Sequence, residues 1–441
     1  MPSARQAAVQ ALMTYRKTGL SAEAALDKQI NHKGLDPRDT ALAARLTFGV
    51  LQNRTLLDFY LGQFSRTPVE KLEPRVLDIL RVAAYQIVFL DRIPARAAVD
   101  EGVSLTKSGS PKAAGLVNAV LRRLSENKAA LPDPPREDLT TYLATKYSHP
   151  RWLVQRFLDE LGLDGAEALL AANNADVPLY AQTNTLKTDT ATLEATLQTE
   201  GVTTERHPWL PDCLILTNTG NPANLPSFQS GQFYIQDPAA KLAVLTANPN
   251  PGTRLLDPCA APGGKSFAAA IQMGNKGEIL ASDLQEKKLT KIREGAARLG
   301  IDILTTRAMD AKDLDPAELG LFDTVIVDAP CSGLGIIRKK PEIRDKPLEE
   351  IARLPEIQRA ILQGAARCVA PGGTLVYATC TILSEENNGV ISAFLESTTD
   401  FVREPFTLPG EIGEAANGEI TLYPHLHDTD GFFFCKLRRV K

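Results

Sequence analysis

Several residue types that would indicate a secreted, metal-binding or membrane protein are scarce in this sequence. It has six cysteines in 441 residues, and none of them forms a C-x-x-C pair. This number and spacing argue against a disulfide framework and a zinc site, and they favour a reduced, cytoplasmic protein. No apolar run approaches the ~20 residues of a membrane span, and the first ten residues lack the apolar core of a secretion signal. We therefore expect no membrane association.

Histidines and aromatic residues are also few. Two of the five histidines, His425 and His427, lie close together, but no third ligand is evident beside them. We therefore predict no metal site. Aromatic residues make up 6% of the chain, which leaves few rings for stacking on nucleic-acid bases.

The charge is unevenly distributed, although the net charge is only −4. Residues 1–140 contain 20 Lys and Arg against 15 Asp and Glu, and the remainder contains 29 against 38. A basic N-terminal part on an acidic body indicates a polyanionic partner. The alternative is an ordinary solvated surface, and the charge count alone does not exclude it.

The pattern of apolar residues predicts three domains. Residues 1–135 carry apolar residues at three- and four-residue spacing, which predicts an all-α bundle that ends in the linker L-P-D-P-P. Residues 140–240 mix short helices and strands, as in a small α+β insert. In residues 241–441 strands and helices alternate, which predicts an α/β fold with a doubly wound, mostly parallel Rossmann-like sheet.

Two helices of the third domain have definite expected bounds. We predict one long helix over Leu348–Val369 and another over Ser384–Leu395. Ser384 is the expected N-terminal cap of the second helix, with Glu385 and Glu386 in its first turn, where acids favour the helix dipole.

Acidic residues and a cysteine follow the predicted parallel strands. Ligands of doubly wound sheets bind beyond the carboxyl ends of the strands, so these side chains should converge on one site. The residues at such ends are Asp257, Asp283, Asp310, Asp328 and Cys380.

A glycine-containing loop follows the first predicted strand of this sheet. Gly263 and Gly264 allow backbone amides to approach a ligand, and the helix that follows favours an anion at its N-terminus. The loop matches neither G-x-G-x-x-G nor G-x-x-x-x-G-K. The predicted cofactor contacts in it are Cys259, Ala260, Ala261, Pro262, Gly263, Gly264 and Lys265.

Two further acids fit a nucleoside cofactor. Asp283 lies 20 residues after Gly263, where a carboxylate usually binds two ribose hydroxyls, and Asp310 follows the next strand, where an acid can accept from an adenine amine. A nucleoside with a short anionic tail fits this set, which favours S-adenosylmethionine. The alternative is that both acids cap loops.

Two cysteines close neighbouring strands. Cys331 follows Asp328 in D-A-P-C-S-G, and Cys380 ends the next strand in A-T-C-T. Either could be a buried structural thiol. As a pair they suit covalent catalysis on cytosine, in which a thiolate adds to C6 so that C5 can attack a methyl sulfonium. Asp328 is the candidate donor at the N3 side of the base, and a second thiol could assist proton removal or product release.

Three motifs in order, D-P-C-A-A-P-G-G-K, D-A-P-C-S-G and A-T-C-T, resemble the RNA cytosine-C5 methyltransferases. Residues 82–103 and 115–124 resemble the NusB-type RNA-binding domain, and the combination is similar to the bacterial enzymes that act on 16S ribosomal RNA. The resemblance implies that Cys380 is the nucleophile and that Cys331 serves product release. It also implies cofactor contacts from residues 259–265, Asp283, Asp310 and Asp328.

Two other functions stay open at this point. One is the same chemistry on tRNA, against which only the NusB-like part argues. The other is a non-catalytic RNA-binding factor with a methyltransferase fold, which the intact motifs disfavour. We expect ribosomal RNA as the partner and a monomeric protein.

Basic residues in two places are candidate phosphate contacts. A loop with four cations near the expected site suits RNA phosphates, although it could be solvated surface. The predicted RNA-binding residues are Arg338, Lys339, Lys340 and Arg344 in this loop and Arg122 and Arg123 in the bundle.

Three positions depart from the pattern of the resembling family. Gln182 stands where that family usually has Arg, which could alter an RNA contact. Asn388 replaces an acid, and Asp345 stands where an aromatic residue is common.

Overall fold

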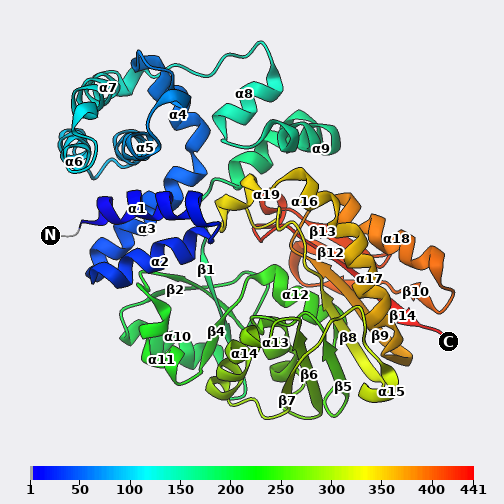
Figure 1. The fold of residues 1–441 in the computed structure, drawn as a ribbon. Helices are drawn as coiled ribbons and strands as arrows, with labels where there is room; N and C mark the ends of the chain where they lie inside the picture. The colour runs from blue at the N-terminus through cyan, green and yellow to red at the C-terminus, as the bar shows by residue number, and fades with distance from the viewer. Residues whose placement is uncertain (1–2) are drawn as a thin grey trace. The chain divides into compact units, whose positions relative to one another are not determined.

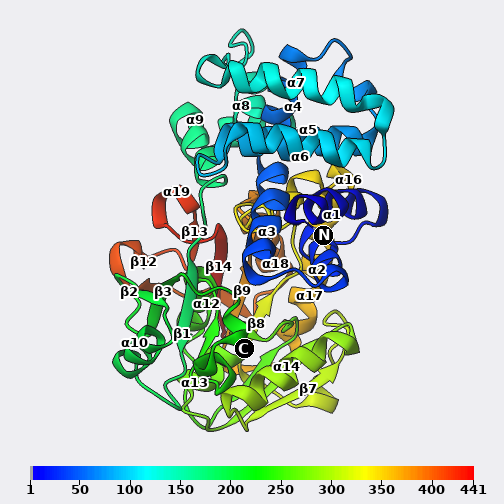
Figure 2. The same ribbon diagram turned by 90° about the vertical axis from the view of Figure 1, so that its left-hand side faces the viewer.

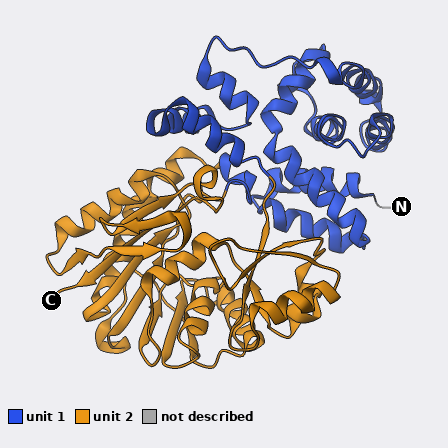
Figure 3. Cartoon of the chain, turned by 180° about the vertical axis from the view of Figure 1, so that it is seen from behind, with its two compact units in different colours: residues 1–175, 337–345 blue, residues 176–336, 346–441 orange. Residues whose placement is uncertain are grey.

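The structure is a computed structural model that describes residues 3–441. The chain forms two compact units (Figure 3). Unit 1 comprises residues 1–175 and 337–345, and unit 2 comprises residues 176–336 and 346–441. Residues 337–345, here called the strap, therefore belong to the N-terminal unit although they lie between two elements of the C-terminal unit in the sequence.

Unit 1 is helical, which confirms the all-α character predicted for residues 1–135, and it also contains two helices of residues 139–172 that the sequence analysis assigned to the α+β insert. Its helices α5, α6 and α7 lie side by side around a core in which Leu57, Leu80 and Leu121 are fully buried (Figure 2). Ser3 and Asp36 cap helix N-termini by accepting backbone N–H groups. The helices are α1 (Ala4–Thr18), α2 (Ala22–Lys33), α3 (Pro37–Gln52), α4 (Arg54–Phe64), α5 (Pro74–Phe89), α6 (Ala95–Lys107), α7 (Ala114–Glu126), α8 (Leu139–Lys146) and α9 (Arg151–Ala172).

Arg344 of the strap joins three helix ends of unit 1. Its side chain is buried, and its guanidinium donates to the main-chain oxygens of Gln52 (2.7 Å), Ser148 (2.9 Å) and Asn173 (3.3 Å). These oxygens lie at or just after the C-terminal ends of α3, α8 and α9. Unpaired carbonyls at such ends carry partial negative charge, so one cation stabilises all three.

The strap is not the row of phosphate-binding cations that the sequence predicts. Arg344 is 4% exposed and Arg338 is 6% exposed, whereas Lys340 is exposed and Lys339 is half-buried. The prediction is wrong for Arg344, because main-chain carbonyls of unit 1 already take its donors. Arg338 is also too deeply buried to reach a phosphate in this conformation.

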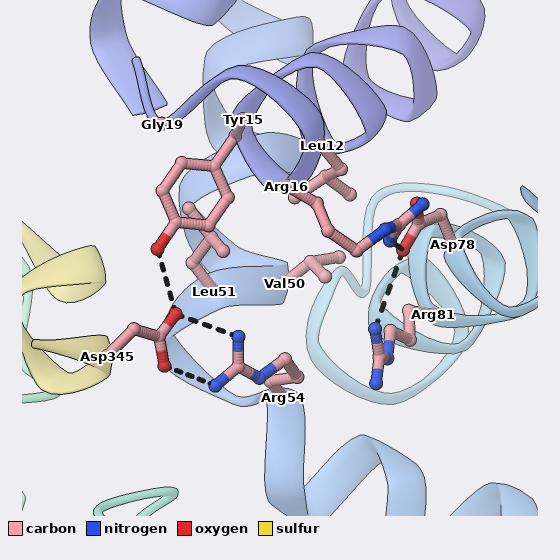
Figure 4. A pocket seen from close by; sticks show the side chains of 10 residues that line it. All are labelled: Leu12, Tyr15, Arg16, Gly19, Val50, Leu51, Arg54, Asp78, Arg81 and Asp345. Atoms are coloured by element: carbon pink, nitrogen blue, oxygen red, sulfur yellow. Dashed lines mark hydrogen bonds and ion pairs between the residues drawn. The ribbon is translucent and has the colours of Figure 1, made fainter. Parts of the chain in front are cut away.

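Asp345 ends the strap in a cluster of ion pairs (Figure 4). Its carboxylate accepts from the Tyr15 hydroxyl (2.8 Å) and from the Arg54 guanidinium (2.9 Å). In the same pocket, which has a volume of about 290 Å³, Arg16 pairs with Asp78 at 2.7 Å. The acid at position 345 is therefore an internal partner of unit 1, which accounts for its presence in place of an aromatic residue.

The main sheet of unit 2 has the predicted doubly wound form. The order is β10-β14-β9-β8-β5-β6-β7, with β13 paired to β14, and the strands from β9 to β7 are parallel. Helices α12, α13 and α14 cover one face, and α17 and α18 cover the other (Figure 1). The strands are β5 (Arg254–Asp257), β6 (Glu278–Asp283), β7 (Leu304–Ala308), β8 (Phe322–Asp328), β9 (Val369–Thr379), β10 (Phe401–Arg403), β13 (Glu419–Leu422) and β14 (Phe432–Arg439).

The remaining elements of unit 2 complete the layers. The covering helices are α12 (Pro238–Ala247), α13 (Gly264–Gln272), α14 (Glu286–Leu299), α17 (Leu354–Arg367) and α18 (Asn388–Ser397). The shorter elements are α15 (Pro316–Leu319), α16 (Leu348–Ala352), α19 (Pro424–His427), β11 (Phe406–Leu408) and β12 (Gly413–Ala415).

A small antiparallel sheet, ordered β2-β3-β1-β4, precedes the main sheet. Gln182 on β1 is 1% exposed and donates to the Gln236 carbonyl (3.1 Å), so the glutamine at this position makes an internal contact. Any effect on RNA binding would have to be indirect. The elements are β1 (Leu179–Thr183), β2 (Thr203–Arg206), β3 (Cys213–Thr217), β4 (Phe233–Ile235), α10 (Thr190–Thr199) and α11 (Pro226–Gln229).

Two predicted helices have different bounds in the structure. The helix expected over Leu348–Val369 breaks at Arg353 into α16 and α17, because Pro355 starts a new first turn. Ser384 does not cap a helix: residues 384–386 form a 3₁₀ turn, and α18 begins at Asn388. Glu386 is fully buried, so it does not lie in an exposed first turn.

No helix in the described part of the chain has the length and apolar character that crossing a bilayer requires.

We predict that Arg344→Ala destabilises unit 1 by about 3 kcal/mol, because it leaves several buried carbonyls without a donor. For a unit of this size that loss lowers Tm by roughly 6–12 °C, which scanning calorimetry of the full chain would measure. Lys340→Ala is the matched control, since it removes an exposed cation from the same strap. Equal Tm values for the two variants would contradict the capping role of Arg344.

Candidate active site

A cavity of about 510 Å³ lies at the carboxyl ends of the parallel strands. The chain runs outward from β5 through β6 to β7 and then returns to place β8 on the other side of β5. Such a switch point opens a crevice between adjacent strand ends. We call this space the switch-point cavity. Its walls include Cys259, Ala261, Asp283, Asp310, Asp328, Cys331 and Cys380.

The loop after β5 is held by a buried carboxylate. Asp257 is 1% exposed and accepts from the Ser266 hydroxyl at 2.7 Å. Burial raises the pKa of Asp257 to about 7. At Gly263, φ is 112°, and a Cβ atom would lie 2.5 Å from the Phe267 ring, so only glycine fits. The turn of the predicted cofactor loop therefore requires glycine at position 263.

The predicted loop residues occupy different positions around the switch-point cavity. Cys259 and Ala261 line it, Pro262 is exposed after a cis peptide bond, and Ala260 is buried behind the wall. The glycines start α13, whose first residue is Gly264.

Lys265 lies beneath the cavity floor and pairs with Asp328. Its Nζ is 2.7 Å from Asp328 Oδ2 and 4.9 Å from the centre of the Phe432 ring. Burial alone would lower the pKa of Lys265, but the charge of Asp328 and the hydrogen bond to it more than offset this and raise the pKa. The pair therefore holds a proton beside the cavity at neutral pH.

Asp283 and Asp310 line the cavity and also cap their own loops. Asp283 is 7% exposed and accepts from the Gln285 backbone N–H at 3.1 Å. Asp310 accepts from the Lys312 backbone N–H at 3.0 Å. The second oxygens lie 3.4 Å from Lys288 Nζ in Asp283 and 3.2 Å from Lys312 Nζ in Asp310. A carboxylate oxygen accepts more than one hydrogen bond, so the loop-capping interpretation and the ligand-binding one are compatible.

The two cysteines meet at the edge of the cavity. Because β8 and β9 are parallel neighbours with Asp328 opposite Ala378, the loops after them bring Cys331 Sγ to 3.2 Å from Cys380 Sγ. Lys346 Nζ donates to the Ser332 carbonyl and fixes the loop that carries Cys331. The sequence places both thiols at one edge, and the structure adds that they are in contact.

The thiol of Cys331 is held in its protonated form. The hydrogen bond with Cys380 raises the pKa of Cys331 well above its usual value, and burial and the charges of Glu386 and Asp328 add to the effect. Either sulfur can donate the hydrogen bond in this contact, and a protonated Cys331 is able to do so.

Sequence reasoning missed the apolar wall of the cavity. Ile357 and Ile361 on α17 and Met309 after β7 face the space between Asp283 and the cysteines. A flat apolar group fits against such side chains. The four-residue spacing of Ile357 and Ile361 indicates that they share one face of α17. Only the packing of α17 in the structure shows that this face lines the cavity.

The predicted RNA-binding residues outside the strap lie on the surface. Arg122 and Arg123 are exposed near the end of α7. Among residues 3–441, no group of three or more His, Cys, Asp or Glu side chains lies close enough to hold a metal ion.

A doubly wound sheet with a ligand cavity at its switch point is the fold of Rossmann-like methyltransferases, and comparisons with known proteins agree. Residues 244–438 match the family described as 16S rRNA methyltransferase RsmB/F, residues 149–222 its ferredoxin-like domain, and residues 2–126 the NusB family. The probable ribosomal RNA small subunit methyltransferase B of Bacillus subtilis (strain 168) is 36% identical over 99% of both chains. This chain belongs to the 16S rRNA methyltransferase RsmB/F family.

Solved structures agree with this assignment. The protein called PH0851 superposes with a TM-score of 0.81 at 27% identity, covering 100% of this chain and 99% of its own. NSun6 from Pyrococcus horikoshii, solved with SFG, gives a TM-score of 0.59 at 25% identity over 66% of this chain and 98% of its own.

We predict that Cys380→Ala lowers the pH at which Cys331 becomes reactive, because it removes the largest cause of the raised pKa of Cys331. Iodoacetamide labelling across a pH series, read by peptide mass spectrometry, would measure the midpoint. Cys259→Ala is the control, since it removes another cavity thiol. An unchanged Cys331 midpoint in Cys380→Ala would show that the sulfur contact does not control its ionisation.

Proposed function

We propose that this protein methylates C5 of a cytosine in 16S ribosomal RNA, with S-adenosylmethionine as methyl donor and a covalent bond from Cys380 to C6 of the base. The observation that carries the proposal is the contact of two thiols, 3.2 Å apart, at the edge of the switch-point cavity. Membership of the family supports methylation of ribosomal RNA, and the thiol pair supports the chemistry at C5.

The residues around the cavity fit S-adenosylmethionine. Asp283 has an oxygen for the ribose hydroxyls, and Asp310 lies where it can accept from the adenine amine. Ile357 and Ile361 supply an apolar surface for the adenine. Cys259 and Ala261 line the cavity and lead into the start of α13, where an anion such as the carboxylate is favoured. The SFG in the related NSun6 structure is an analogue of this cofactor, which also supports the choice. When bound, the cofactor supplies an electrophilic methyl group.

The reaction that we propose begins and ends at Cys380. Its thiolate adds to C6 of the cytosine, and the electron pair displaced to C5 forms the bond to the methyl group as the carbon–sulfur bond of the sulfonium breaks. A base then removes the C5 proton. The electrons of that bond restore the C5–C6 double bond, and the Cys380 thiolate leaves.

Cys331 suits a role in that last step. Its raised pKa favours the protonated form, and its sulfur lies 3.2 Å from the Cys380 sulfur, so it can donate an S–H hydrogen bond to a Cys380 thiolate. A donor at this position stabilises negative charge on Cys380 as the C6–sulfur bond breaks. Product release is therefore the step that depends on Cys331.

Asp328 and Lys265 suit the other side of the base. Attack at C6 pushes negative charge toward N3, and a proton there stabilises it. The proton held by the Asp328–Lys265 pair, whose atoms are 2.7 Å apart, can be shared with N3 through Asp328. Lys265 also keeps Asp328 in a single orientation at the cavity wall.

The buried strap arginines are poorly placed to bind phosphate. We therefore propose that RNA phosphates contact the other four cations predicted from the sequence. These are Arg122 and Arg123 on α7 and Lys340 with the half-buried Lys339 in the strap. Phosphate contacts position the RNA, and the cytosine must be unpaired to reach the cavity.

The two alternatives have distinct outcomes in one experiment. Bisulfite mapping of total RNA from cells with and without this protein would locate each methylcytosine that depends on it. A single position lost from 16S ribosomal RNA supports the proposal, and a position lost from tRNA supports the tRNA enzyme. No change at any cytosine, together with measurable RNA binding, would support a non-catalytic RNA-binding factor.

We predict that Cys380→Ala abolishes methyl transfer, at least about 10³-fold in turnover, because no thiolate can add to C6. Affinity for S-adenosylmethionine, measured by calorimetry, should stay within about twofold, since the change removes only one sulfur atom from the cavity wall. Turnover close to that of the wild type would sink the assignment of Cys380. Cys368→Ala, a buried thiol away from the cavity, is the control.

We predict that Cys331→Ala accumulates a covalent protein–RNA adduct, because the thiolate of Cys380 loses the donor that helps it leave. A denaturing gel of enzyme, cofactor and 16S RNA would show the adduct as a slowly migrating band that RNase removes. The double variant Cys331→Ala, Cys380→Ala should show no band. A band in Cys380→Ala alone would reverse the roles of the two cysteines.

A further inference from the structure

Glu386 is a fully buried carboxylate just beyond the wall of the switch-point cavity. It ends the 3₁₀ turn after the Cys380 strand and has no exposed surface. Its Oε2 accepts from the Ser332 backbone N–H (2.8 Å), and its Oε1 accepts from the Thr381 hydroxyl (3.2 Å). Ser332 follows Cys331 and Thr381 follows Cys380, so one carboxylate holds the residues next to both thiols.

Gln358 completes the hold on the Cys331 loop. This α17 side chain is fully buried, and its amide nitrogen donates to Glu386 Oε2 (2.8 Å) and to the Pro330 carbonyl (3.0 Å). The residues on both sides of Cys331 are therefore tied to the same pair of side chains. The loop around Cys331 cannot shift without breaking hydrogen bonds to the buried Glu386 carboxylate. Hydrogen bonds to charged groups are among the stronger ones in proteins.

The Cys380 loop is held from both sides as well. Asn387, the residue after Glu386, accepts from the Thr379 hydroxyl (2.6 Å) and donates to the Thr381 carbonyl (3.0 Å). The Ser332 and Thr381 hydroxyls also hydrogen-bond to each other at 2.8 Å. The two loops thus form one network whose common acceptor is Glu386.

We propose that Glu386 is a positioning residue that sets the distance between the sulfur atoms of Cys331 and Cys380 and thereby couples methyl transfer to product release. The inference rests on the proposed function for its catalytic consequence. Glu386 does not line the cavity, so it acts through the loops that it holds.

The geometry leaves little tolerance in the thiol pair. At 3.2 Å the sulfur atoms are in direct contact, so an S–H group of one can donate to the other, and this hydrogen bond weakens as the loops move apart. A shift of about 1 Å in a reacting group can cost on the order of a hundredfold in rate. The charge of Glu386 also favours the neutral form of Cys331, which is the form that can donate. The titratable groups around Cys331 include Cys380, Glu386, Asp328 and Tyr377, and the Lys346 ammonium donates to the Cys331 carbonyl at 3.5 Å.

The substitution Glu386→Gln tests this inference. It replaces one carboxylate oxygen, which accepts a hydrogen bond, by an amide NH₂ group that cannot accept from the donor facing it. We expect turnover to fall at least about tenfold while KM for RNA and affinity for S-adenosylmethionine stay within about twofold. The fraction of enzyme trapped as protein–RNA adduct should rise, because release slows when Cys331 no longer meets Cys380. Glu385→Gln, at the exposed neighbouring position, is the matched control.

A measurement without RNA separates this inference from the proposed function. In Glu386→Gln the pH midpoint for iodoacetamide labelling of Cys331 should fall, because the variant removes a negative charge and loosens the sulfur contact. That result is expected whatever the RNA substrate is. Wild-type turnover together with a wild-type labelling midpoint would overturn the positioning role.

A second variant covers the case in which Glu386→Gln does not fold. Gln358→Met keeps the side-chain length but removes the donor to Glu386 and to the Pro330 carbonyl, so a smaller shift in the same two measurements is expected. Loss of thermal stability with no change in the Cys331 labelling midpoint would show that the network is only structural, and would also overturn the inference.

Discussion

The parallel pairing of β8 with β9 is the constraint on which the site depends. Its register places Asp328 opposite Ala378, so the chain reaches Cys331 three residues beyond the end of β8 and Cys380 one residue beyond the end of β9. A register slip by two residues would separate the thiols by about 7 Å along the strands. Both strands are central and buried on both faces, which fixes this register through packing as well as hydrogen bonding.

Charge around the cavity is arranged so that opposite signs balance locally. Lys265 is buried between Asp328, which pairs with it, and Asp257, whose pKa lies near neutrality because of burial. The site therefore keeps one firmly bound proton and a second that is weakly held, without a large net charge. This local balance suits the proposed cationic methyl donor, and family membership supports methylation of ribosomal RNA.

Local patterns in the sequence predicted much of this structure, and long-range contacts account for the misses. The strands β5 and β8 end at Asp257 and Asp328, as the sequence analysis expected, because short apolar runs end in these polar residues. Ser384 fails as a cap in a segment where Glu386, two residues later, is buried and has a partner 54 residues away at Ser332. Arg344 fails as a phosphate ligand for a similar reason: helix ends up to 292 residues away take its donors, and sequence spacing does not reveal them.

The strap has a consequence for how the protein is made. Translation delivers the helices of unit 1 first, but the cation that caps α3, α8 and α9 is synthesised only after β8 of the second unit. The helices of unit 1 therefore leave the ribosome before the cation that binds the carbonyls at three of their ends. The order of synthesis thus makes completion of unit 1 a late event, after the loop of Cys331 has been made.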